Sequence, residues 1–255
     1  MTASELRTLP PPRPLPGFSA TALFLDLDGT LAAIEPRPED VGPEPWRTSL
    51  LRELGERLGG KLAVISGRSL EEVDRILEGS VPAVAAVHGL VRRKADGTIE
   101  QAPAAPSLAE ARARFETMAK AHPDLKLEDK GVSIALHYRQ APQLGIRVRD
   151  EANSIAAATG LKLQLGDMVA EICTPGQDKG AALKAFMREP PFQRAAPVFV
   201  GDDLTDENGF RAARALGGVS VLVGPMRPTA ADLRLDSVAA VRAWLEAGLM
   251  QDAHA

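Results

Sequence analysis

Two separate stretches of the chain share one pattern, in which apolar strands alternate with helices. The first stretch opens with the buried-strand pattern TALFLDLDGT, followed by helically spaced leucines in WRTSLLRELGERLGG and a second apolar strand, KLAVIS. After residue 176 this alternation returns, with PVFVGDD and VSVLVG as strands between helical patterns. Strands that alternate with helices predict a parallel, right-handed α/β sheet.

The residues between these stretches follow a different pattern. VRRKADGTIEQ predicts a hairpin, and beyond it a helix followed by paired strands occurs twice, which predicts a small antiparallel sheet covered by two helices. We therefore expect a Rossmann-like parallel-sheet core formed by residues 18–90 and 176–250, interrupted by an inserted α+β cap domain of residues 91–175. The proline-rich residues 1–17 are expected to be a disordered leader.

Charge and composition exclude several classes of function. A formal net charge of -4 provides no basic field for nucleic acid or acidic lipid headgroups. The chain has neither a signal-peptide pattern at its start nor a run of about 18 apolar residues. Its single cysteine, Cys173, fits core packing in a reducing compartment. We expect a cytoplasmic monomer that contacts neither nucleic acid nor a membrane.

The run DLDGT places two carboxylates, Asp26 and Asp28, at the end of the first strand. Side chains two residues apart project to the same side of an extended strand, so the pair can share one site. Such a pair suits magnesium, a hard cation that prefers oxygen ligands, and one carboxylate can attack phosphorus while the other moves a proton. An acidic turn that does no chemistry is the alternative for this pentapeptide alone.

Two further elements supply phosphate-binding chemistry. Ser66, Gly67 and Arg68 lie where KLAVIS meets a helix whose Ser69 and Glu72 have capping-box spacing, so a hydroxyl, backbone amides and a guanidinium can converge on an oxyanion. Lys179 opens a later helix, where its charge can offset that of a phosphoryl group. Taken singly, Arg68 is equally well interpreted as a surface arginine beside a turn, and a lone lysine at such a position is usually solvated.

The fourth element, GDDLTDE, follows another apolar strand. It places Asp202 and Asp203 at the strand end and Asp206 in the first turn of the next helix, where an acid also stabilises the helix dipole. Ligands of open α/β sheets bind at the carboxyl ends of the strands. Four chemistry-bearing elements at successive strand ends therefore predict one shared site.

DLDGT, ISGR, a lysine followed by glycine, and GDDLTDE, in that order, resemble the haloacid dehalogenase phosphatases. Within that superfamily, EPRPEDV, AAVHG, ALHYRQAP, VAEI and PVFVGDDLTDENGF are similar to the trehalose 6-phosphate phosphatases over nearly the whole chain after residue 20. The resemblance implies hydrolysis of trehalose 6-phosphate to trehalose and phosphate through an aspartyl phosphate, with Mg²⁺ as cofactor.

The resemblance also implies a role for each core residue. Asp26 would be the nucleophile, Asp28 the general acid and then the base, and Ser66 and Lys179 phosphate ligands. Magnesium would contact Asp26, the backbone carbonyl of Asp28, and Asp202, with Asp203 and Asp206 supporting these ligands directly or through water. The sugar-reading residues would come from the cap and the entrance, as Gly67, Arg68, His88, Glu128, Lys130, Ser133, His137, Arg139 and Glu171.

Several readings remain open beside this one. The alternating residues of VSIALHYR also describe an ordinary strand, and Asp178 stands where relatives often carry a small polar residue. Related phosphatases for sucrose phosphate or mannosylglycerate phosphate share the same core, and a phosphomutase would return the phosphate to the sugar. A signalling receiver also combines acids and a lysine on an α/β sheet, but it needs no inserted cap of this length.

Overall fold

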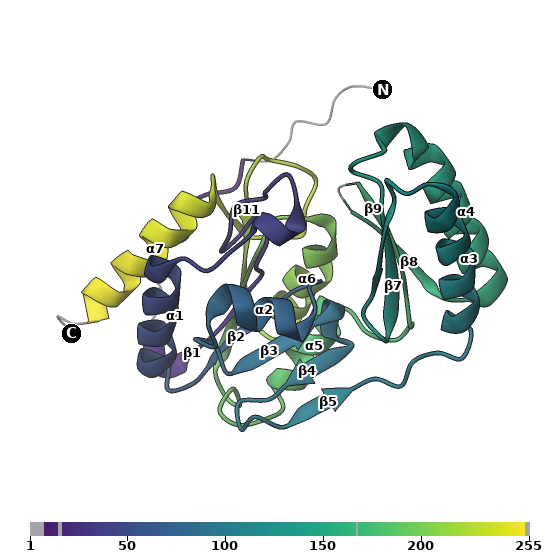
Figure 1. The fold of residues 1–255 in the computed structure, drawn as a ribbon. Coiled ribbons are helices and arrows are strands. Elements are labelled where there is room, and N and C mark those ends of the chain that lie inside the picture. The colour runs from purple at the N-terminus through teal and green to yellow at the C-terminus, as the bar shows by residue number, and fades with distance from the viewer. Residues whose placement is uncertain (1–7, 15–16, 167, 253–255) are drawn as a thin grey trace, which may run out of the picture. The chain divides into compact units, whose positions relative to one another are not determined.

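The computed structural model describes residues 8–14, 17–166 and 168–252 of the chain. They form two compact units, which are described separately: one extends up to Glu100 and resumes at Asp178, and the other comprises Gln101–Gln177 (Figure 1). The second unit is therefore an insertion into the first. Short 3-10 helices connect several elements, at Phe18–Ala20, Pro38–Asp40, Val87–Gly89, Pro142–Leu144 and Leu204–Asp206.

The larger unit is built on an eight-stranded sheet of order β12-β11-β10-β1-β2-β3-β4-β5. Neighbours from β12 to β3 are parallel, and β4 runs antiparallel to β3. The central strand β1 is buried along its whole length, as expected of a parallel strand covered on both faces. The strands are β1 (Thr21–Leu25), β2 (Leu62–Ile65), β3 (Ala83–Ala86), β4 (Val91–Arg93), β5 (Ile99–Gln101), β10 (Ala196–Gly201), β11 (Val219–Val223) and β12 (Leu233–Leu235).

Helices pack on both faces of this sheet. Helices α5 (Lys179–Phe186) and α6 (Glu207–Ala215) cover one face, where Phe186 and Phe210 join a buried cluster with the side chains of β1, β2, β3, β10 and β11. Helices α1 (Pro45–Arg57) and α7 (Val238–Asp252) contact each other on the opposite side, and α2 (Leu70–Leu77) follows β2 (Figure 1). The predicted capping box at Ser69 and Glu72 begins α2.

Two sequence predictions about this unit need correction. The hairpin formed by β4 and β5 was assigned to the cap, but it extends the large sheet because β4 pairs with the edge of β3. Part of the predicted disordered leader is also held in place. The carbonyl of Pro10 accepts a hydrogen bond from the amide of Arg234, and that of Arg13 accepts one from the Trp244 indole. A proline has no N–H group, but its carbonyl can still accept a hydrogen bond, as that of Pro10 does. Residues 1–7 and 15–16 of the predicted leader lie outside the described residues.

The smaller unit has the predicted architecture of two helices on an antiparallel sheet. Its sheet order is β6-β7-β9-β8, and every neighbouring pair is antiparallel. Ile134, Leu136 and Ile172 point to one face and form a core with the two helices. The elements are α3 (Leu108–Ala121), β6 (Lys126–Asp129), β7 (Ser133–His137), α4 (Gly145–Thr159), β8 (Lys162–Gly166) and β9 (Val169–Cys173).

The opposite face of the small sheet is polar. Strand register places Ala135 between Glu128 on β6 and Glu171 on β9, and side chains alternate, so Ser133 and His137 project to this same face. Cys173 is buried, as the sequence suggests. The sheet therefore separates an apolar layer from a cluster of polar side chains.

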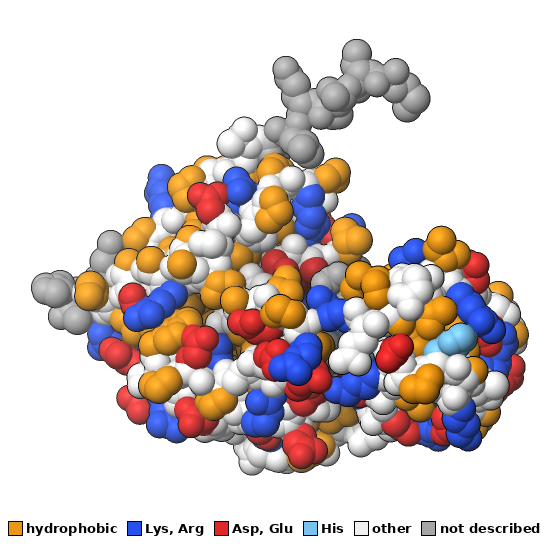
Figure 2. All heavy atoms as spheres, turned by 45° about the horizontal axis from the view of Figure 1, so that its top comes forward, with side chains coloured by type: hydrophobic (Ala, Val, Ile, Leu, Met, Phe, Trp, Pro, Cys, Tyr) orange, Lys and Arg blue, Asp and Glu red, His pale blue; other side chains and the backbone are white. Residues whose placement is uncertain are grey.

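The surface carries charge of both signs. Lysine and arginine side chains alternate with aspartate and glutamate over the face drawn in Figure 2. None of the helices in the described ranges combines the length and the hydrophobicity needed to cross a bilayer.

Candidate active site

The site begins where β1 ends. Asp26 follows the strand directly, is 4% exposed, and is held by a hydrogen bond from its amide to the carbonyl of Val200 on β10. The chain then turns back on itself, because the amides of Leu31 and Ala32 both donate to the Leu27 carbonyl at 2.8 Å. This tight loop carries Asp28 beside the strand end.

Gly29 makes the turn possible in two ways. Its φ of +76° lies in the left-handed region, which side-chain-bearing residues rarely adopt. A Cβ atom at this position would also lie 2.1 Å from Oδ2 of Asp202. The loop after β1 thus contacts the acid at the end of β10 directly, and only glycine leaves room for that carboxylate.

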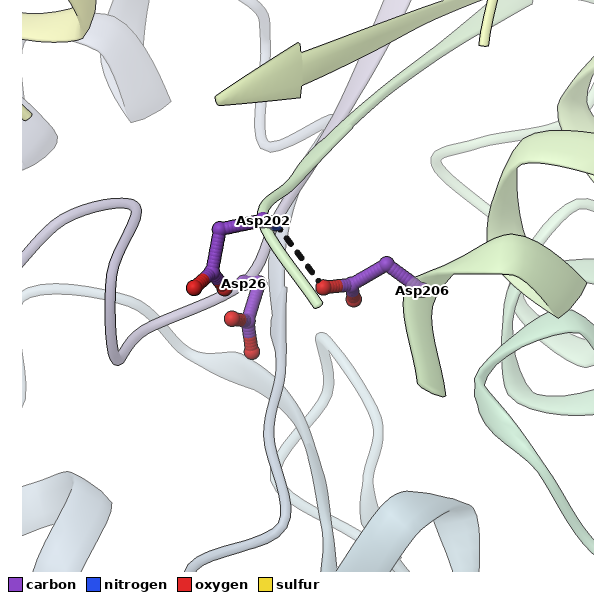
Figure 3. Close-up of side chains that lie close together, drawn as sticks. All are labelled: Asp26, Asp202 and Asp206. Atoms are coloured by element: carbon purple, nitrogen blue, oxygen red, sulfur yellow. Dashed lines mark hydrogen bonds between the residues drawn. The ribbon is translucent and has the colours of Figure 1, made fainter. Parts of the chain in front are cut away.

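Three carboxylates gather at this edge of the sheet. Asp26, Asp202 and Asp206 each offer an oxygen within 4.8 Å of the others (Figure 3). Burial raises the pKa of Asp26 well above its ordinary value, and burial together with Asp206 and Asp203 raises the pKa of Asp202 to about 7. The cluster therefore carries more negative charge than its buried surroundings stabilise.

Lys179 supplies the positive charge within this cluster. Its Nζ lies 2.8 Å from Oδ1 of Asp26 and 2.7 Å from Oδ1 of Asp206, and the side chain is 3% exposed. Burial alone would lower the pKa of Lys179, but Asp206 and Asp26 raise it, so the ammonium stays charged. Asp178, the unusual residue before it, turns its carboxylate to the Ala181 amide and caps α5.

Asp206 and Asp203 have different partners from Asp26 and Asp202. Besides Lys179, Asp206 accepts hydrogen bonds from the backbone amides of Asp202 and Asp203, both at 3.0 Å. The Asp203 carboxylate accepts from the amide and hydroxyl of Thr205. Asp206 therefore fixes the acidic loop, and Asp203 stabilises the turn that starts α6. The metal-supporting role that the sequence predicts for both residues stays a prediction.

The second strand end supplies the predicted phosphate-binding loop. Ser66 is fully buried, and its Oγ accepts a hydrogen bond from the Arg68 amide at 3.1 Å. Two hydrogen bonds of 2.9 Å join this loop to the turn that contains His88. The Val87 amide donates to the Arg68 carbonyl, and the His88 amide donates to the Ser66 carbonyl. A Cβ on Gly67 would lie 2.6 Å from the His88 ring, so a larger residue here would displace that ring.

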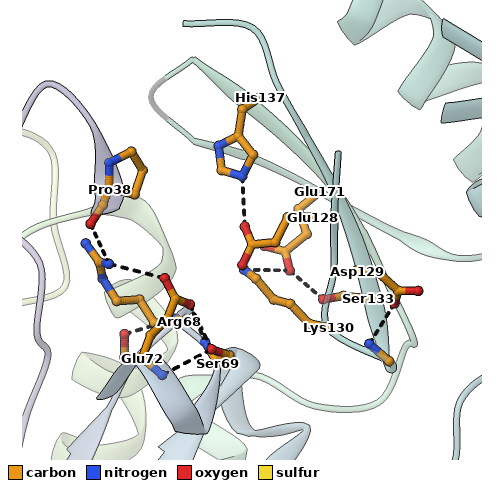
Figure 4. Close-up of polar contacts among 12 residues, drawn as sticks. Pro38, Arg68, Ser69, Glu72, Glu128, Asp129, Lys130, Ser133, His137 and Glu171 are labelled. Carbon is orange, nitrogen blue, oxygen red and sulfur yellow. Dashed lines mark hydrogen bonds and ion pairs between the residues drawn. The ribbon is translucent and has the colours of Figure 1, made fainter. Parts of the chain in front are cut away.

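Arg68 is bound to the protein's own carboxylate. Its Nε and Nη2 each donate to an oxygen of Asp28 at 2.7 Å, in the two-pronged geometry that arginine and carboxylate prefer. The same guanidinium donates to the Pro38 carbonyl at 2.8 Å and lies 3.4 Å from Glu72 (Figure 4). The residue predicted to read the substrate thus holds Asp28 in this structure.

The donor set fits a hard divalent cation. Asp26 and Asp202 are close, largely buried and have raised pKa values, as expected of carboxylates that share a site without enough compensating positive charge. All donors are oxygens, which magnesium and similar ions prefer. In the described part of the chain, the cluster thus contains the oxygen donors for a divalent-cation site.

The polar face of the small sheet joins five predicted sugar-reading residues. Ser133 Oγ donates to Glu171 at 2.6 Å, and Lys130 Nζ lies 3.4 Å from Glu171 and 3.7 Å from Glu128. His137 Nε2 lies 2.8 Å from Glu128, and this contact helps to lower the pKa of that carboxyl against the effect of burial (Figure 4). Arg139, the remaining predicted sugar-reading residue of the small unit, follows β7 in a turn.

One buried residue of this region has no role in the sequence prediction. Arg47 on α1 is fully buried and donates to three backbone carbonyls, those of Leu31, Gly42 and Ile76. It thereby fastens the loop after β1 to the end of α2. Its only signal in the sequence is an arginine on the apolar face of a helical pattern, which does not reveal its partners.

Comparison with known proteins decides the family. The trehalose-phosphatase family model matches residues 24–239. The chain is 41% identical to trehalose-6-phosphate phosphatase of Escherichia coli strain K12 over 227 residues, which covers 88% of this chain and 85% of that protein. The chain belongs to the trehalose-phosphatase family. A probable trehalose-phosphate phosphatase of Sinorhizobium fredii is 36% identical, over 81% of this chain and 79% of the relative.

Solved structures of the family have the same fold. A trehalose-6-phosphate phosphatase related protein superposes with a TM-score of 0.75 at 26% identity, covering 91% of this chain and 98% of that one. The C-terminal domain of the Candida albicans trehalose-6-phosphate phosphatase gives a TM-score of 0.80 at 21% identity, covering 91% and 93%. The predicted fold, a haloacid dehalogenase core with an inserted α+β cap, is confirmed.

Proposed function

We propose that this trehalose-phosphatase family member hydrolyses trehalose 6-phosphate to trehalose and inorganic phosphate, with Mg²⁺ bound at the acidic cluster. The observation that carries the proposal is the position of Asp26, buried at the end of the central strand, with Lys179 at 2.8 Å and Asp202 beside it. The family match over residues 24–239 connects this geometry to trehalose phosphate.

Asp26 is the proposed nucleophile. Lys179 holds one of its carboxylate oxygens, and the other attacks phosphorus while the bond from phosphorus to the sugar oxygen breaks. Phosphoryl transfer depends mainly on alignment of the reacting groups and on neutralisation of their negative charge. Lys179 supplies a fixed positive charge that serves alignment and neutralisation alike. Asp26, Asp202 and the backbone carbonyl of Asp28 would hold Mg²⁺, which supplies further charge neutralisation when bound.

Asp28 is the proposed proton carrier. It gives a proton to the departing sugar oxygen, then takes one from the water that attacks the phosphoenzyme, which releases phosphate and restores Asp26. In this structure Arg68 occupies both oxygens of Asp28. Each of these oxygens keeps a second lone pair, which is the proposed site of the transferred proton. Ser66, which is buried at the end of β2, is the proposed hydroxyl ligand of the phosphate.

The polar cluster of the small unit is the proposed sugar reader. Lys130, Glu128 and Glu171 present paired charges on the polar face of the small sheet, and such groups hydrogen-bond sugar hydroxyls well because they act as strong donors and acceptors. Gly67, Arg68, His88, Ser133, His137 and Arg139 complete the proposed substrate contacts. The comparisons do not favour sucrose phosphate or mannosylglycerate phosphate, and a cytoplasmic, monomeric state remains a prediction.

A panel of sugar phosphates tests the proposal. Release of inorganic phosphate is measured from trehalose, sucrose, mannosylglycerate and glucose phosphates, in Mg²⁺ and in EDTA. We expect trehalose 6-phosphate to be hydrolysed best, only with metal, and not by Asp26→Asn, whose circular dichroism spectrum should match that of the unaltered protein. Equal hydrolysis of all four substrates, or full activity in Asp26→Asn, would refute the assignment.

A further inference from the structure

The loop that follows β10 is fixed by an arginine from a distant part of the chain. Arg227, which comes after β11, donates to the carbonyl of Asp202 from Nε at 3.3 Å and from Nη2 at 3.1 Å. The same Nη2 donates to the carbonyl of Asp203 at 2.5 Å. One planar group thus binds the carbonyls of both acids that follow the strand.

The amides of the same two residues are bound from the other side. Asp206 accepts the hydrogen bonds of the Asp202 and Asp203 amides at 3.0 Å each. The loop therefore has its N–H groups on an aspartate and its C=O groups on Arg227. Since backbone groups held on both sides leave a peptide little freedom to rotate, this arrangement fixes the direction in which the Asp202 carboxylate leaves the chain.

Glu207 in turn holds Arg227. Its carboxylate is bonded by Nη1 of Arg227, and it also accepts hydrogen bonds from the Thr229 hydroxyl at 2.7 Å and the Ala230 amide at 2.8 Å. The Glu207 side chain is 11% exposed and that of Arg227 is 21% exposed. This network, Arg227, Glu207 and Thr229, connects the segment after β11 to the first turn of α6.

We propose that Arg227 is a positioning residue for the divalent-cation site, which it controls by fixing the loop that carries Asp202. The inference rests on the metal site of the proposed function and extends it to a residue outside the acidic cluster. Arg227 makes no contact with Asp26 in the described structure, so it acts through the carbonyls of Asp202 and Asp203. Lysine cannot replace it fully, because an ammonium lacks the planar fork that spans two carbonyls and a carboxylate.

The test measures Mg²⁺ binding without substrate. The apparent Kd comes from the rise of Tm with Mg²⁺ concentration in protein first treated with EDTA, because a ligand of the folded state raises Tm by mass action. We expect Arg227→Met to weaken Mg²⁺ binding by about 10- to 100-fold, the usual cost of losing a group that orients a metal ligand. Arg227→Lys should give a smaller loss.

Arg242→Met is the matched control. Arg242 also pairs with a glutamate, Glu246 at 2.8 Å, but lies on α7 and does not contact the acidic loop in the described structure. Its Kd for Mg²⁺ should stay within about twofold of the unaltered protein. The inference is overturned if the Kd of Arg227→Met for Mg²⁺ stays within about twofold of that of the unaltered protein. If Arg227→Met does not fold, the same criterion applies to Arg227→Lys.

Failure of the inference differs from failure of the proposed function. If the unaltered protein binds Mg²⁺ and Arg227→Met does not, the inference holds even where trehalose 6-phosphate is not hydrolysed. If trehalose 6-phosphate is hydrolysed and Arg227→Met binds Mg²⁺ normally, only the inference fails. The Tm in EDTA reports any purely structural cost of the substitution separately.

Discussion

Replacing Gly29 by alanine should damage the acidic cluster far more than it damages the fold. The substitution has two separable costs. The backbone φ of +76° is unfavourable for alanine by about 1–2 kcal/mol, which corresponds to a fall in Tm of roughly 2–4 °C per kcal/mol for a domain of this size. The new Cβ would also lie 2.1 Å from Oδ2 of Asp202, whereas ordinary contact begins at 3.4 Å.

The clash determines the expected size of the effect on activity. To restore ordinary contact, the loop or the Asp202 side chain must move by more than 1 Å, and a misplacement of about 1 Å at a reacting site can cost about 100-fold in rate. We therefore expect Gly29→Ala to lose about 100-fold in kcat and to bind Mg²⁺ more weakly, since Asp202 is the proposed ligand that must move.

Gly217→Ala is the control for the backbone cost. Gly217 has almost the same φ, +75°, but a Cβ there meets no atom within 4 Å. Both variants should lose similar unfolding free energy from the backbone, measured by urea denaturation, and only Gly29→Ala should lose activity in the phosphate-release assay. Full activity in Gly29→Ala, or equal losses of activity in both variants, would refute the argument that Gly29 makes room for Asp202.

Three further predictions test the charges. Lys179→Met leaves Asp26 and Asp206 buried without their shared cation, so urea denaturation at pH 7 should show a loss of about 3–5 kcal/mol, and a loss below about 1 kcal/mol would argue against the pairing. The pKa of Asp202 is about 7 in the folded state, against about 3.9 when unfolded. Between pH of about 4 and about 7 the folded state therefore binds more protons than the unfolded state, and the metal-free protein should lose stability as pH rises through this range. Calorimetry in EDTA should show a weaker trend in Asp202→Asn; identical slopes would contradict it. Lys130→Met should lower kcat/KM for trehalose 6-phosphate by about 10- to 100-fold and spare a small aryl phosphate, whereas equal losses would exclude a sugar-specific role.

The sequence predicted the parts of the site that lie at strand ends. Asp26, Ser66 and Asp202 each follow an apolar run, and in a parallel sheet such positions lie at one edge whatever the order of the strands. The helix starts were predictable for the same local reason, as the capping box at Ser69 shows. Strand ends and helix starts could therefore be predicted from the sequence, because each depends on residues that are close together in the chain.

Contacts between distant segments could not be predicted. Nothing in the local sequence shows that Arg68 binds Asp28 or that Arg227 binds two carbonyls, because these partners depend on the order of the strands. The β4–β5 hairpin was placed in the wrong unit because its turn pattern specifies a hairpin but not the sheet it joins. The described part of the leader contacts Arg234 and Trp244, which are more than 200 residues away.

The pairing of β1 with β10 has a consequence for how the protein is made. Strand β1, which Asp26, the proposed nucleophile, follows directly, is flanked by β2 on one side and by β10 on the other, and β10 ends at Gly201. While the chain is being synthesised, one edge of β1 has no partner until the whole inserted unit has already been translated. Lys179 and Asp202 also follow the inserted unit in the chain, so the acidic cluster cannot form until both have been translated. Such long-range parallel pairing is slow to form and leaves an apolar strand open to wrong partners meanwhile.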